Sequence, residues 1–260
     1  MPEQEAAHTD DALVGDWRIL QPRDGHRWST DDLLCAWFAL ETLDRLGMRP
    51  DRALDLGTGL GSVAMMLAWA LPDLHVTGIE KQAHRLALAR QSAARNGIRD
   101  RSLLLAGDIR DTARILHEAG APRDGWPLVT ATPPYWPVAS GTHRDDDKAR
   151  CRFDLIGSLE SYAAVVPELL GPRGLLVMVY DGRQMDRLEQ ATRALAPVRL
   201  LPVHAREGDP PLLVLGAWSR NAEPSEAGHD LSEDPLTLRL RDGSRSEAFR
   251  AIRIRMGMPT

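Results

Sequence analysis

Short apolar runs of strand length alternate with longer segments of helical periodicity along most of the chain. The runs are, in chain order, Ala53–Leu56, Leu74–Ile79, Leu103–Ala106, Trp126–Ala131, Leu175–Tyr180, Val198–Val203 and Leu212–Trp218. Strands that are connected through helices can pair in parallel, and a parallel sheet has to be covered on both faces. The alternation therefore predicts an α/β fold, with a mostly parallel sheet of seven strands between two layers of helices.

The segments outside this alternation set the predicted domain limits. Residues 1–14 open with a polar, acidic stretch and are expected to form a flexible tail, and residues 15–220 are expected to form one domain. Residues 221–260 are interpreted as a linker followed by a short strand and helix. The acidic start is unlike a signal peptide, and no apolar run reaches the eighteen or so residues that span a membrane. We therefore expect a cytoplasmic protein without a membrane segment.

A glycine-rich turn follows the first strand-like run, in the sequence Asp55-Leu56-Gly57-Thr58-Gly59-Leu60-Gly61. Glycines at a strand-to-helix turn let the backbone turn tightly and approach a ligand closely. The spacing is G-x-G-x-G, one residue shorter than the dinucleotide fingerprint G-x-G-x-x-G. The turn favours a nucleoside ligand, although a glycine turn that binds nothing is a common alternative.

Acidic residues end three successive strand-like runs: Asp55, Glu80 and Asp108. Parallel strands bring these ends to one edge of the sheet, where ligands bind in such folds. Glu80 could accept hydrogen bonds from both ribose hydroxyls, Asp108 from an adenine amine, and Asp55 could face an ammonium group. Each acid alone could equally be a helix cap. Three of them beside a glycine turn favour a nucleoside site.

The fourth strand-like run ends in Thr132-Pro133-Pro134-Tyr135-Trp136. Proline has no N–H, so this strand end offers a hydroxyl and carbonyl oxygens without a competing donor. Such acceptors suit the two hydrogens of a substrate amine, and the rings of Tyr135 and Trp136 suit stacking. The alternative is a loop stopped by prolines whose aromatic residues pack in the core.

In combination these motifs resemble the class I S-adenosylmethionine (SAM)-dependent methyltransferases, in which N/D/S-P-P-Y/F is the motif of enzymes that methylate amino nitrogens. A narrower resemblance is to the bacterial tRNA(Val) adenine-N6 methyltransferases. It rests on Gln21-Pro22 followed by Gly25-His26-Arg27-Trp28-Ser29-Thr30-Asp31, similar to that family's Q-P…G-Y-R-F-S-x-D opening, and covers the chain from about Gly15 to Ile254.

This resemblance implies a Rossmann-like fold, SAM as cofactor, no metal, and tRNA or another nucleic acid as substrate. Catalytic roles fall on Thr132, Pro133, Pro134 and Tyr135, and substrate binding on Tyr135 and Trp136. The implied cofactor-binding residues are Arg27, Thr30, Asp31, Asp55, Gly57, Thr58, Gly59, Gly61, Glu80, Lys81, Asp108, Ile109 and Thr132.

One departure from the family concerns the substrate, because Thr132 stands where the family has Asn. Threonine there is more usual among cytosine amino methyltransferases, so a cytosine, an rRNA or DNA base, a protein glutamine or a small metabolite are alternatives to adenine. A SAM-binding module without catalysis is a third possibility. The net charge of −5 argues weakly against a chain coated in nucleic acid.

Two other charged features favour ordinary solvated surface. The acidic run Asp145–Asp147 lies in a polar loop, where consecutive acids are usually solvated and do not hold a metal. Arginines between Arg239 and Arg255 could face RNA, but interleaved acids favour a surface role.

The cysteines Cys35 and Cys151 lack metal-ligand spacing and are expected to be buried thiols.

Overall fold

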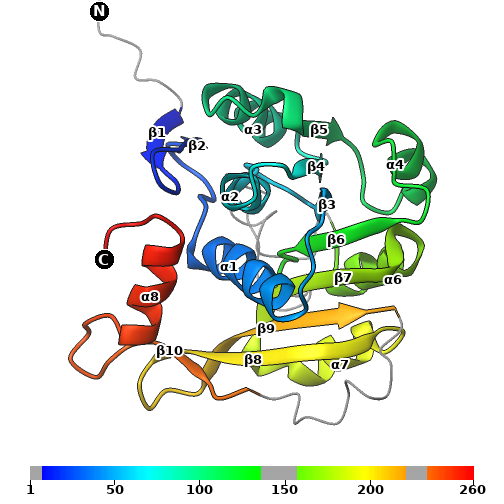
Figure 1. The fold of residues 1–260 in the computed structure, drawn as a ribbon. Coiled ribbons are helices and arrows are strands. Elements are labelled where there is room, and N and C mark those ends of the chain that lie inside the picture. Colours follow the sequence, from blue (N-terminus) through cyan, green and yellow to red (C-terminus); the bar gives the residue numbers. More distant parts are fainter. Residues whose placement is uncertain (1–7, 136–156, 221–232) are drawn as a thin grey trace, which may run out of the picture.

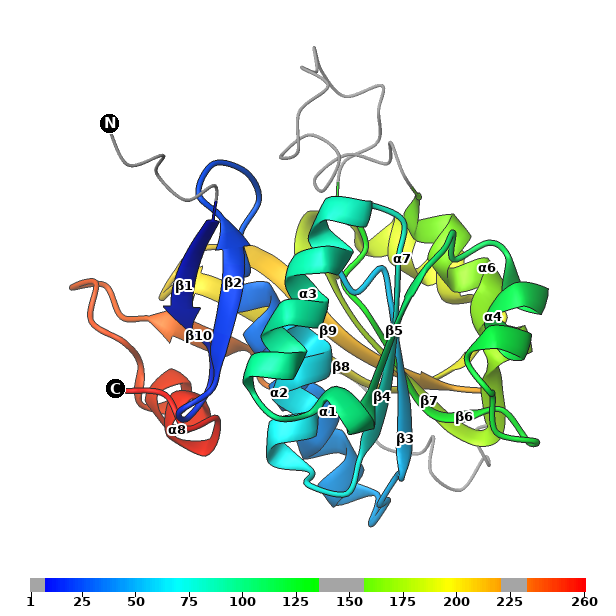
Figure 2. The ribbon, with the colours of Figure 1, turned by 90° about the horizontal axis from the view of Figure 1, so that it is seen from above.

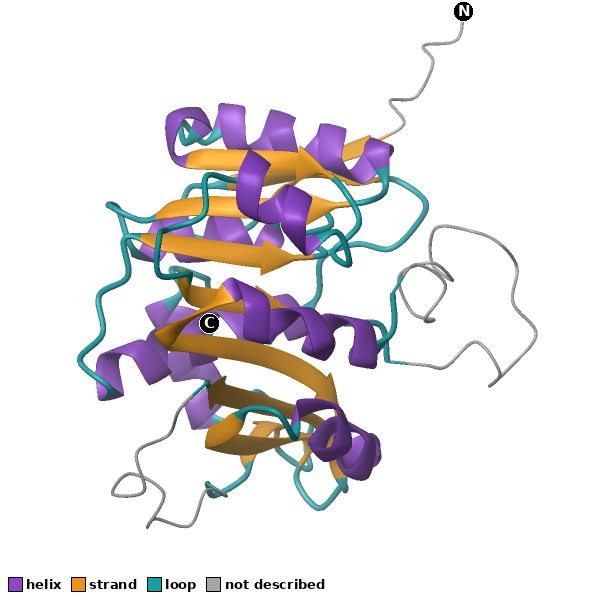
Figure 3. Ribbon diagram, turned by 90° about the vertical axis from the view of Figure 1, so that its right-hand side faces the viewer, coloured by secondary structure: helices purple, strands orange, loops and turns teal. Residues whose placement is uncertain are grey.

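The computed structural model describes residues 8–135, 157–220 and 233–260 of the chain (Figure 1). Its centre is an eight-stranded sheet with the order β10-β8-β9-β7-β6-β3-β4-β5, and β1 and β2 form a separate antiparallel pair. Within the large sheet only β9 runs antiparallel to its neighbours, β7 and β8. Figure 3 shows the stacked strands of this sheet from the side.

The described elements have the following bounds. The strands are β1 (His8–Ala12), β2 (Arg18–Pro22), β3 (Arg52–Leu56), β4 (His75–Glu80), β5 (Ser102–Ala106), β6 (Trp126–Ala131), β7 (Leu170–Asp181), β8 (Ala196–Arg206), β9 (Pro211–Ser219) and β10 (Leu236–Arg239). The α-helices are α1 (Thr30–Arg45), α2 (Ser62–Ala70), α3 (Ala83–Arg95), α4 (Thr112–Glu118), α6 (Leu159–Leu169), α7 (Met185–Thr192) and α8 (Glu247–Arg255). Short 3₁₀ turns are η1 (Arg99–Arg101) and η3 (Gly182–Gln184).

Helices cover both faces of the large sheet, with α1, α2 and α3 on one side and α4, α6 and α7 on the other (Figures 1 and 2). The central strand β7 contributes to both layers because successive side chains of a strand point to opposite faces. Leu175, Val177 and Val179 belong to the core under α1 and α2. Leu176 and Met178 belong to the core under α6. The predicted α/β architecture with a mostly parallel sheet is confirmed.

The order of the strands creates a switch point beside β3. The chain passes from β3 outward through β4 to β5, then crosses back so that β6 pairs with the other side of β3. The connections after β3 and β6 therefore diverge at neighbouring strand ends, which opens a crevice at the carboxyl edge. The Gly57–Gly61 turn follows β3 and Thr132 follows β6, so the fold places both predicted motifs at this crevice.

The N-terminal segment departs from the expected flexible tail, which is wrong for residues 8–14. His8–Ala12 is strand β1, in antiparallel register with β2, and Leu13 and Val14 are buried. Asp10 is joined to Arg18 by an ion pair of 2.7 Å. Backbone pairing and charge hold this strand, and no buried apolar face is needed. Its sequence therefore shows no alternation of apolar residues from which a strand could be predicted.

The C-terminal segment adds an eighth strand to the seven that were predicted. Strand β10 pairs in parallel with β8, from Leu236 beside Val203 to Arg239 beside Arg206. Helix α8 then packs beside α1, with buried Phe249, Ile252 and Met256 (Figure 1). The predicted strand and helix of this segment are thus part of the main fold, while the linker expected before them falls mostly outside the described residues.

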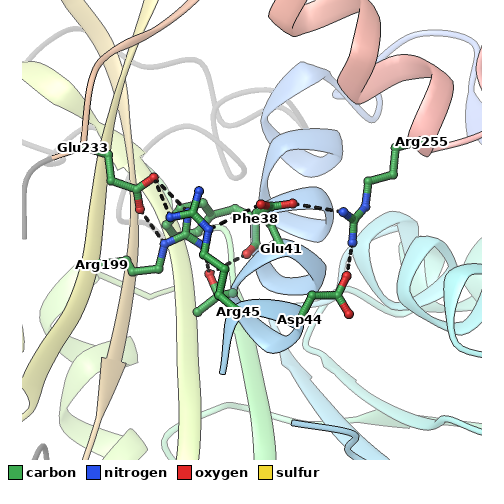
Figure 4. A network of polar contacts seen from close by, with 8 residues as sticks. Phe38, Glu41, Asp44, Arg45, Arg199, Glu233 and Arg255 are labelled. Carbon is green, nitrogen blue, oxygen red and sulfur yellow. Dashed lines mark hydrogen bonds and ion pairs between the residues drawn. The ribbon is translucent and has the colours of Figure 1, made fainter. Parts of the chain in front are cut away.

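Ion pairs tie this C-terminal segment to the last turns of α1 (Figure 4). Arg199 of β8 is buried, and its guanidinium donates to Glu233 at 2.5 and 3.0 Å and to the Thr42 hydroxyl at 2.6 Å. The same guanidinium lies 4.5 Å from the centre of the Phe38 ring. On the other side of α1, Arg255 of α8 pairs with Glu41 and Asp44. We call these contacts the α1 charge network.

The described residues include no helix that is both long and apolar enough to cross a membrane. Cys35 is a buried free thiol, and Cys151 lies outside the described residues.

Candidate active site

A cavity lies at the carboxyl edge of the sheet, between the ends of β3, β4, β5 and β6. We call it the first cavity. Of the residues predicted to bind a cofactor, it is lined by Arg27, Gly57, Thr58, Gly59, Glu80, Lys81, Asp108, Ile109 and Thr132. Thr30, Asp31, Asp55 and Gly61 do not line it. Residues outside the predicted set complete the wall, among them Asp32, Arg85 and Tyr162.

The glycine turn has a backbone that side chains would obstruct. Gly57, Gly59 and Gly61 have φ values of +64°, +58° and +79°, a region that favours glycine. A Cβ on Gly57 would lie 2.0 Å from the Tyr162 hydroxyl, and one on Gly59 would lie 3.2 Å from the Arg85 guanidinium. Gly61 is the N-cap of α2, so its role is to start that helix. The turn therefore presents bare backbone to the first cavity.

Glu80 and Asp108 stand at the ends of neighbouring strands, as predicted. The buried Glu80 carboxylate accepts hydrogen bonds from the backbone N–H of Gly59 at 2.9 Å and of Gln82 at 2.6 Å. Asp108 pairs with Arg110 and with Lys81, and hydrogen bonds from Arg110 hold the pKa of its carboxyl well below the usual range. The Asp108 carboxylate therefore stays ionised near neutral pH, and both side chains present acceptors at the cavity wall.

Asp55 is placed differently from the expectation that it faces an ammonium group. Its carboxylate is buried and accepts hydrogen bonds from the Thr58 hydroxyl at 2.6 Å and the Thr130 hydroxyl at 2.7 Å. Burial raises its pKa to about 6, against the lowering effect of these two hydrogen bonds. Asp55 thus fixes the glycine turn to strands β3 and β6 from below.

The segment around Arg27 is organised by residues of the β1–β2 pair. Arg27 donates to the Asp11 carboxylate at 2.8 Å and to the Thr9 hydroxyl at 3.0 Å, both on β1. The buried Gln21 accepts from the backbone N–H of Trp28 at 2.9 Å and donates to Asp11. The Gln21…Arg27-Trp28 motif therefore encodes a set of contacts that hold Arg27 against the first cavity.

A second cavity adjoins the first and is lined in part by Thr132, Pro133 and Tyr135. It shares His26, Asp32 and Thr132 with the first cavity. Pro134 lines the first cavity only. The strand end predicted to grip a substrate amine thus stands where the two cavities meet. Trp136, also predicted to bind substrate, lies outside the described residues.

Contacts on several sides hold Tyr135 in place. Its hydroxyl donates to the Asp31 carboxylate at 2.5 Å, and its backbone carbonyl accepts from Gln184 at 2.6 Å and from the Tyr180 hydroxyl at 3.2 Å. The Tyr180 ring meets the Tyr135 ring edge-on, with centroids 5.6 Å apart. Burial raises the pKa of the Tyr135 hydroxyl well above its usual value, so the phenol remains a donor. These contacts fix the ring at the wall of the second cavity.

Several residues of the site carried no signal in the sequence. Tyr162 lies on α6, far from every motif. Asp181 ends β7 and Arg183 lies in η3, and neither belongs to a motif. Asp32 follows directly after the Gly25–Asp31 motif and is not part of it. Ser29 and Asp32 form a capping box at the start of α1. Asp32 also lines both cavities.

Comparisons with known proteins agree with this geometry. The family described as methyltransferase small domain matches residues 35–115. A tRNA1(Val) (adenine(37)-N6)-methyltransferase of Porphyromonas gingivalis is 31% identical over 215 residues, which cover 82% of this chain and 80% of that protein. A release factor glutamine methyltransferase of Bordetella pertussis is 31% identical over 201 residues, which cover 75% of this chain and 69% of that protein.

The fold has close structural neighbours as well. A crystal structure described as a predicted O-methyltransferase from Agrobacterium tumefaciens superposes with a TM-score of 0.65 at 18% identity, covering 88% of this chain and 98% of that chain. Together these findings show that the chain belongs to the class I SAM-dependent methyltransferases, as a member of the methyltransferase small domain family. SAM is the cofactor of this family.

The residues of the first cavity fit SAM. The bare Gly57–Gly59 backbone leaves room that a Cβ would fill, and Glu80 presents a carboxylate at the neighbouring strand end. Asp108 and Ile109 follow the next strand, where a polar and an apolar wall suit an adenine ring. Among the described residues no group of three or more His, Cys, Asp or Glu side chains is arranged to hold a metal. The Asp145–Asp147 run lies outside them.

Proposed function

We propose that the protein methylates an exocyclic amino nitrogen, and that its substrate is adenine in tRNA. The observation that carries this proposal is the position of Thr132, which lines both cavities at the end of β6. A base that enters the second cavity would bring its amine to Thr132, opposite the glycine turn of the first cavity. SAM supplies the methyl group from that side.

The chain's own residues account for activation of a poor nucleophile. The Thr132 hydroxyl and the Pro133 carbonyl can each accept one hydrogen of the amine, and neither proline has an N–H that competes. Hydrogen bonds of this kind draw on the N–H bonds and favour a tetrahedral nitrogen over one conjugated with the ring. Tyr135, held by Asp31 and Gln184, offers a fixed face for a base that has left its stack. Alignment of the amine then contributes most of the rate.

Two observations favour tRNA. The relative from Porphyromonas gingivalis carries the name of a tRNA adenine-N6 methyltransferase and matches over most of both chains. Arg183 lines the second cavity with its side chain 54% exposed, and its guanidinium is oriented by the buried Asp181 carboxylate at 2.8 and 2.6 Å. An arginine oriented in this way at the mouth of the cavity suits a phosphate of the substrate.

A protein glutamine is the second candidate, because a release factor glutamine methyltransferase matches at the same 31% identity. A glutamine amide has the same N–H₂ geometry and would use Thr132 and Pro133 in the same way. It is smaller than adenine and needs no aromatic face.

The test is methyl transfer from SAM carrying a labelled methyl group. Purified protein is incubated separately with unmodified tRNA transcripts, total tRNA, rRNA, DNA and release factors, and the products are digested and separated. The proposal expects N6-methyladenosine from tRNA. Label recovered in N5-methylglutamine or in another base overturns the tRNA assignment. Intact SAM binding with no transfer to any of these acceptors would indicate a binding module and overturn the enzymatic proposal.

A further inference from the structure

The two cavities share a small group of residues: His26, Asp32 and Thr132. A reacting amine at their junction has to lose one proton when it gains a methyl group. The Thr132 hydroxyl can accept a hydrogen bond, but a protonated hydroxyl is far too acidic to hold a proton at neutral pH. Of the three shared residues, only Asp32 and His26 have side chains that can take up that proton.

The Asp32 carboxylate is held rigidly with one oxygen available. Its Oδ2 atom accepts from the Ser29 backbone N–H at 3.1 Å and from the Ser62 hydroxyl at 3.0 Å. Within the described part of the chain, Oδ1 accepts no hydrogen bond, and it is not among the buried polar atoms that lack a partner. The Oδ1 atom therefore borders the cavities, on a carboxyl group fixed by the first turn of α1 and the first residue of α2.

We propose that Asp32 is a further catalytic residue, the general base that receives the proton of the methylated amine. This rests on the proposed function. The amine nitrogen forms the new N–C bond with its lone pair, and the C–S bond breaks with its electrons left on sulfur. The nitrogen then passes one proton to Oδ1 of Asp32, which becomes a carboxylic acid and later releases the proton to water.

The other carboxylates at this edge are engaged elsewhere. Asp31 accepts from the Tyr135 hydroxyl and lines the second cavity only. Glu80 accepts from two backbone N–H groups and Asp108 pairs with cations, and both line the first cavity only. Asp32 is the carboxylate that reaches both cavities in the described chain. The base thus comes from α1, whereas the amine acceptors come from β6.

The charges around Asp32 set the pH at which it can act. Burial raises its pKa to about 7, with a further contribution from the Asp31 carboxylate beside it on α1. Hydrogen bonds from Ser29 and Ser62 lower the pKa, and Asp55 on β3 raises it. The remaining titratable or charged neighbours are Cys35 on α1, Tyr135 after β6, His26 and Arg27 in the loop before α1, and Arg85 on α3. An acid with a pKa near the working pH is suited to general base catalysis.

The test is single-turnover methyl transfer between pH 5.5 and 9, with the acceptor that the wild-type protein methylates. The wild-type rate should rise with pH and level off above a midpoint near 7. Asp32→Asn keeps an acceptor for Ser29 and Ser62, and should lose this rise together with roughly 100-fold in rate. Ser62→Ala removes a hydrogen bond that stabilises the carboxylate, so the midpoint should move up by roughly 0.5 to 1 pH unit.

A measurement without cofactor tests the same group independently. Because the folded-state pKa of Asp32 lies above its unfolded value of 3.8, this carboxyl costs stability as pH rises from about 4 to about 7. Across this window the melting temperature of Asp32→Asn should therefore rise relative to that of the wild type. Above pH 7 the difference between the two melting temperatures should stay constant. A difference that does not change with pH overturns the proposal.

Matched variants separate the remaining outcomes. In His26→Gln the methyl-transfer rate should still rise with pH. If this rise is lost in His26→Gln but kept in Asp32→Asn, His26 receives the proton and the proposal is overturned. If the wild type transfers the methyl group and Asp32→Asn does so at the same rate and with the same pH dependence, the role of Asp32 is overturned. The proposed function then remains intact. Absence of any transfer by the wild type is the distinct failure of the proposed function.

Discussion

Helix α1 carries carboxylates at both ends, in opposite electrostatic settings. At its N-terminal end Asp31 and Asp32 face the cavities, and burial raises the pKa of both. At its C-terminal end Glu41 and Asp44 meet Arg255, while Arg199 and Glu233 close the network beside them (Figure 4). Burial alone would raise the pKa of Glu233, but hydrogen bonds and the charge of Arg199 outweigh it, so that pKa is lowered.

The contrast shows how one helix serves two purposes. At the network end the charges are compensated, so they stabilise the folded chain. At the cavity end burial, and for Asp32 the charge of Asp31 beside it, outweigh the hydrogen bonds that these carboxylates accept, which costs stability. Natural proteins tolerate such a cost where function requires it. Changes at the network end should therefore cost stability, and changes at the cavity end should cost activity.

The largest effect is expected from Arg199→Ala in the network. It removes a buried charge and the donor to the Thr42 hydroxyl, and leaves the half-buried Glu233 with only the exposed Arg45 as its ion-pair partner. Breaking a buried pair typically costs about 3–5 kcal/mol of unfolding free energy. Chemical denaturation should show this loss, and methyl transfer per folded molecule should stay at the wild-type rate. A stable variant with poor transfer would contradict the division between the two ends.

Thr132→Val is the matching change at the cavity end. It keeps the approximate shape and removes the acceptor, so single turnover should slow by roughly tenfold to a hundredfold, equal to about 1.4–2.7 kcal/mol of barrier. SAM affinity, measured by calorimetry, should change little. Thr132→Asn is the control and should remain active if the target is adenine. If Thr132 only caps the loop, the valine variant will melt earlier and turn over normally.

The pH dependence of stability should have opposite signs for a carboxyl group beside the cavity and for one in the α1 charge network. The pKa of Asp55, beside the cavity, is raised to about 6. Its ionisation therefore lowers the free energy of unfolding as pH rises from about 4 to about 6. In that window the melting temperature of Asp55→Asn should rise relative to that of the wild type. The pKa of Glu233 is lowered, so its contribution is present above the unfolded value of 4.5 and is lost as pH falls through the folded value.

Glu233→Gln should accordingly lose several degrees in melting temperature at pH 7 and approach the wild type in acid. Melting curves of both variants between pH 3 and 8 check the two signs. Curves that change in the same direction would show that the surroundings of the cavity and of the α1 charge network do not differ in this way.

The smallest effect is expected from Arg255→Gln on the outer side of the network. The Arg255 side chain is 39% exposed, and exposed ion pairs contribute about 0.2–1 kcal/mol. The loss should shrink further when salt is raised to 1 M, because salt screens exposed charges. A loss comparable to that of Arg199→Ala would mean that the network acts as one cooperative unit.

The strands and the glycine turn could be predicted because apolar periodicity reports burial directly. Strand β6 has the predicted bounds, Trp126–Ala131, whereas β7 begins five residues earlier than predicted, at Leu170 instead of Leu175. The stretch from Gly171 to Gly174 has the composition of a turn, but it is an irregularity within β7, because Leu170 already pairs with Trp126 of β6 before the regular register resumes at Leu175. Local composition could not predict that pairing.

The site was predictable where a motif lies at a strand end and unpredictable where residues meet only in three dimensions. Thr132 and Glu80 follow from strand ends. Tyr162 comes from a distant helix, and the burial of Asp55 behind two threonines depends on the register of β3 and β6. Asp32 caps the start of α1, and a single acid at a helix start gives no sign that it also lines two cavities.

The pairing of β10 with β8 has a consequence for association between chains. An uncovered sheet edge offers a row of backbone donors and acceptors on which another chain can build a cross-β assembly. Strand β10 covers this edge from Val203 to Arg206, and farther along β8 Pro197 and Pro202 each lack a backbone donor. During synthesis, the two prolines are present as soon as β8 is made. The pairing with β10 can form only when residues 236–239 have left the ribosome. The short strand β10 thus takes the edge position in place of the longer β8, and it is made after the strands that border the cavities.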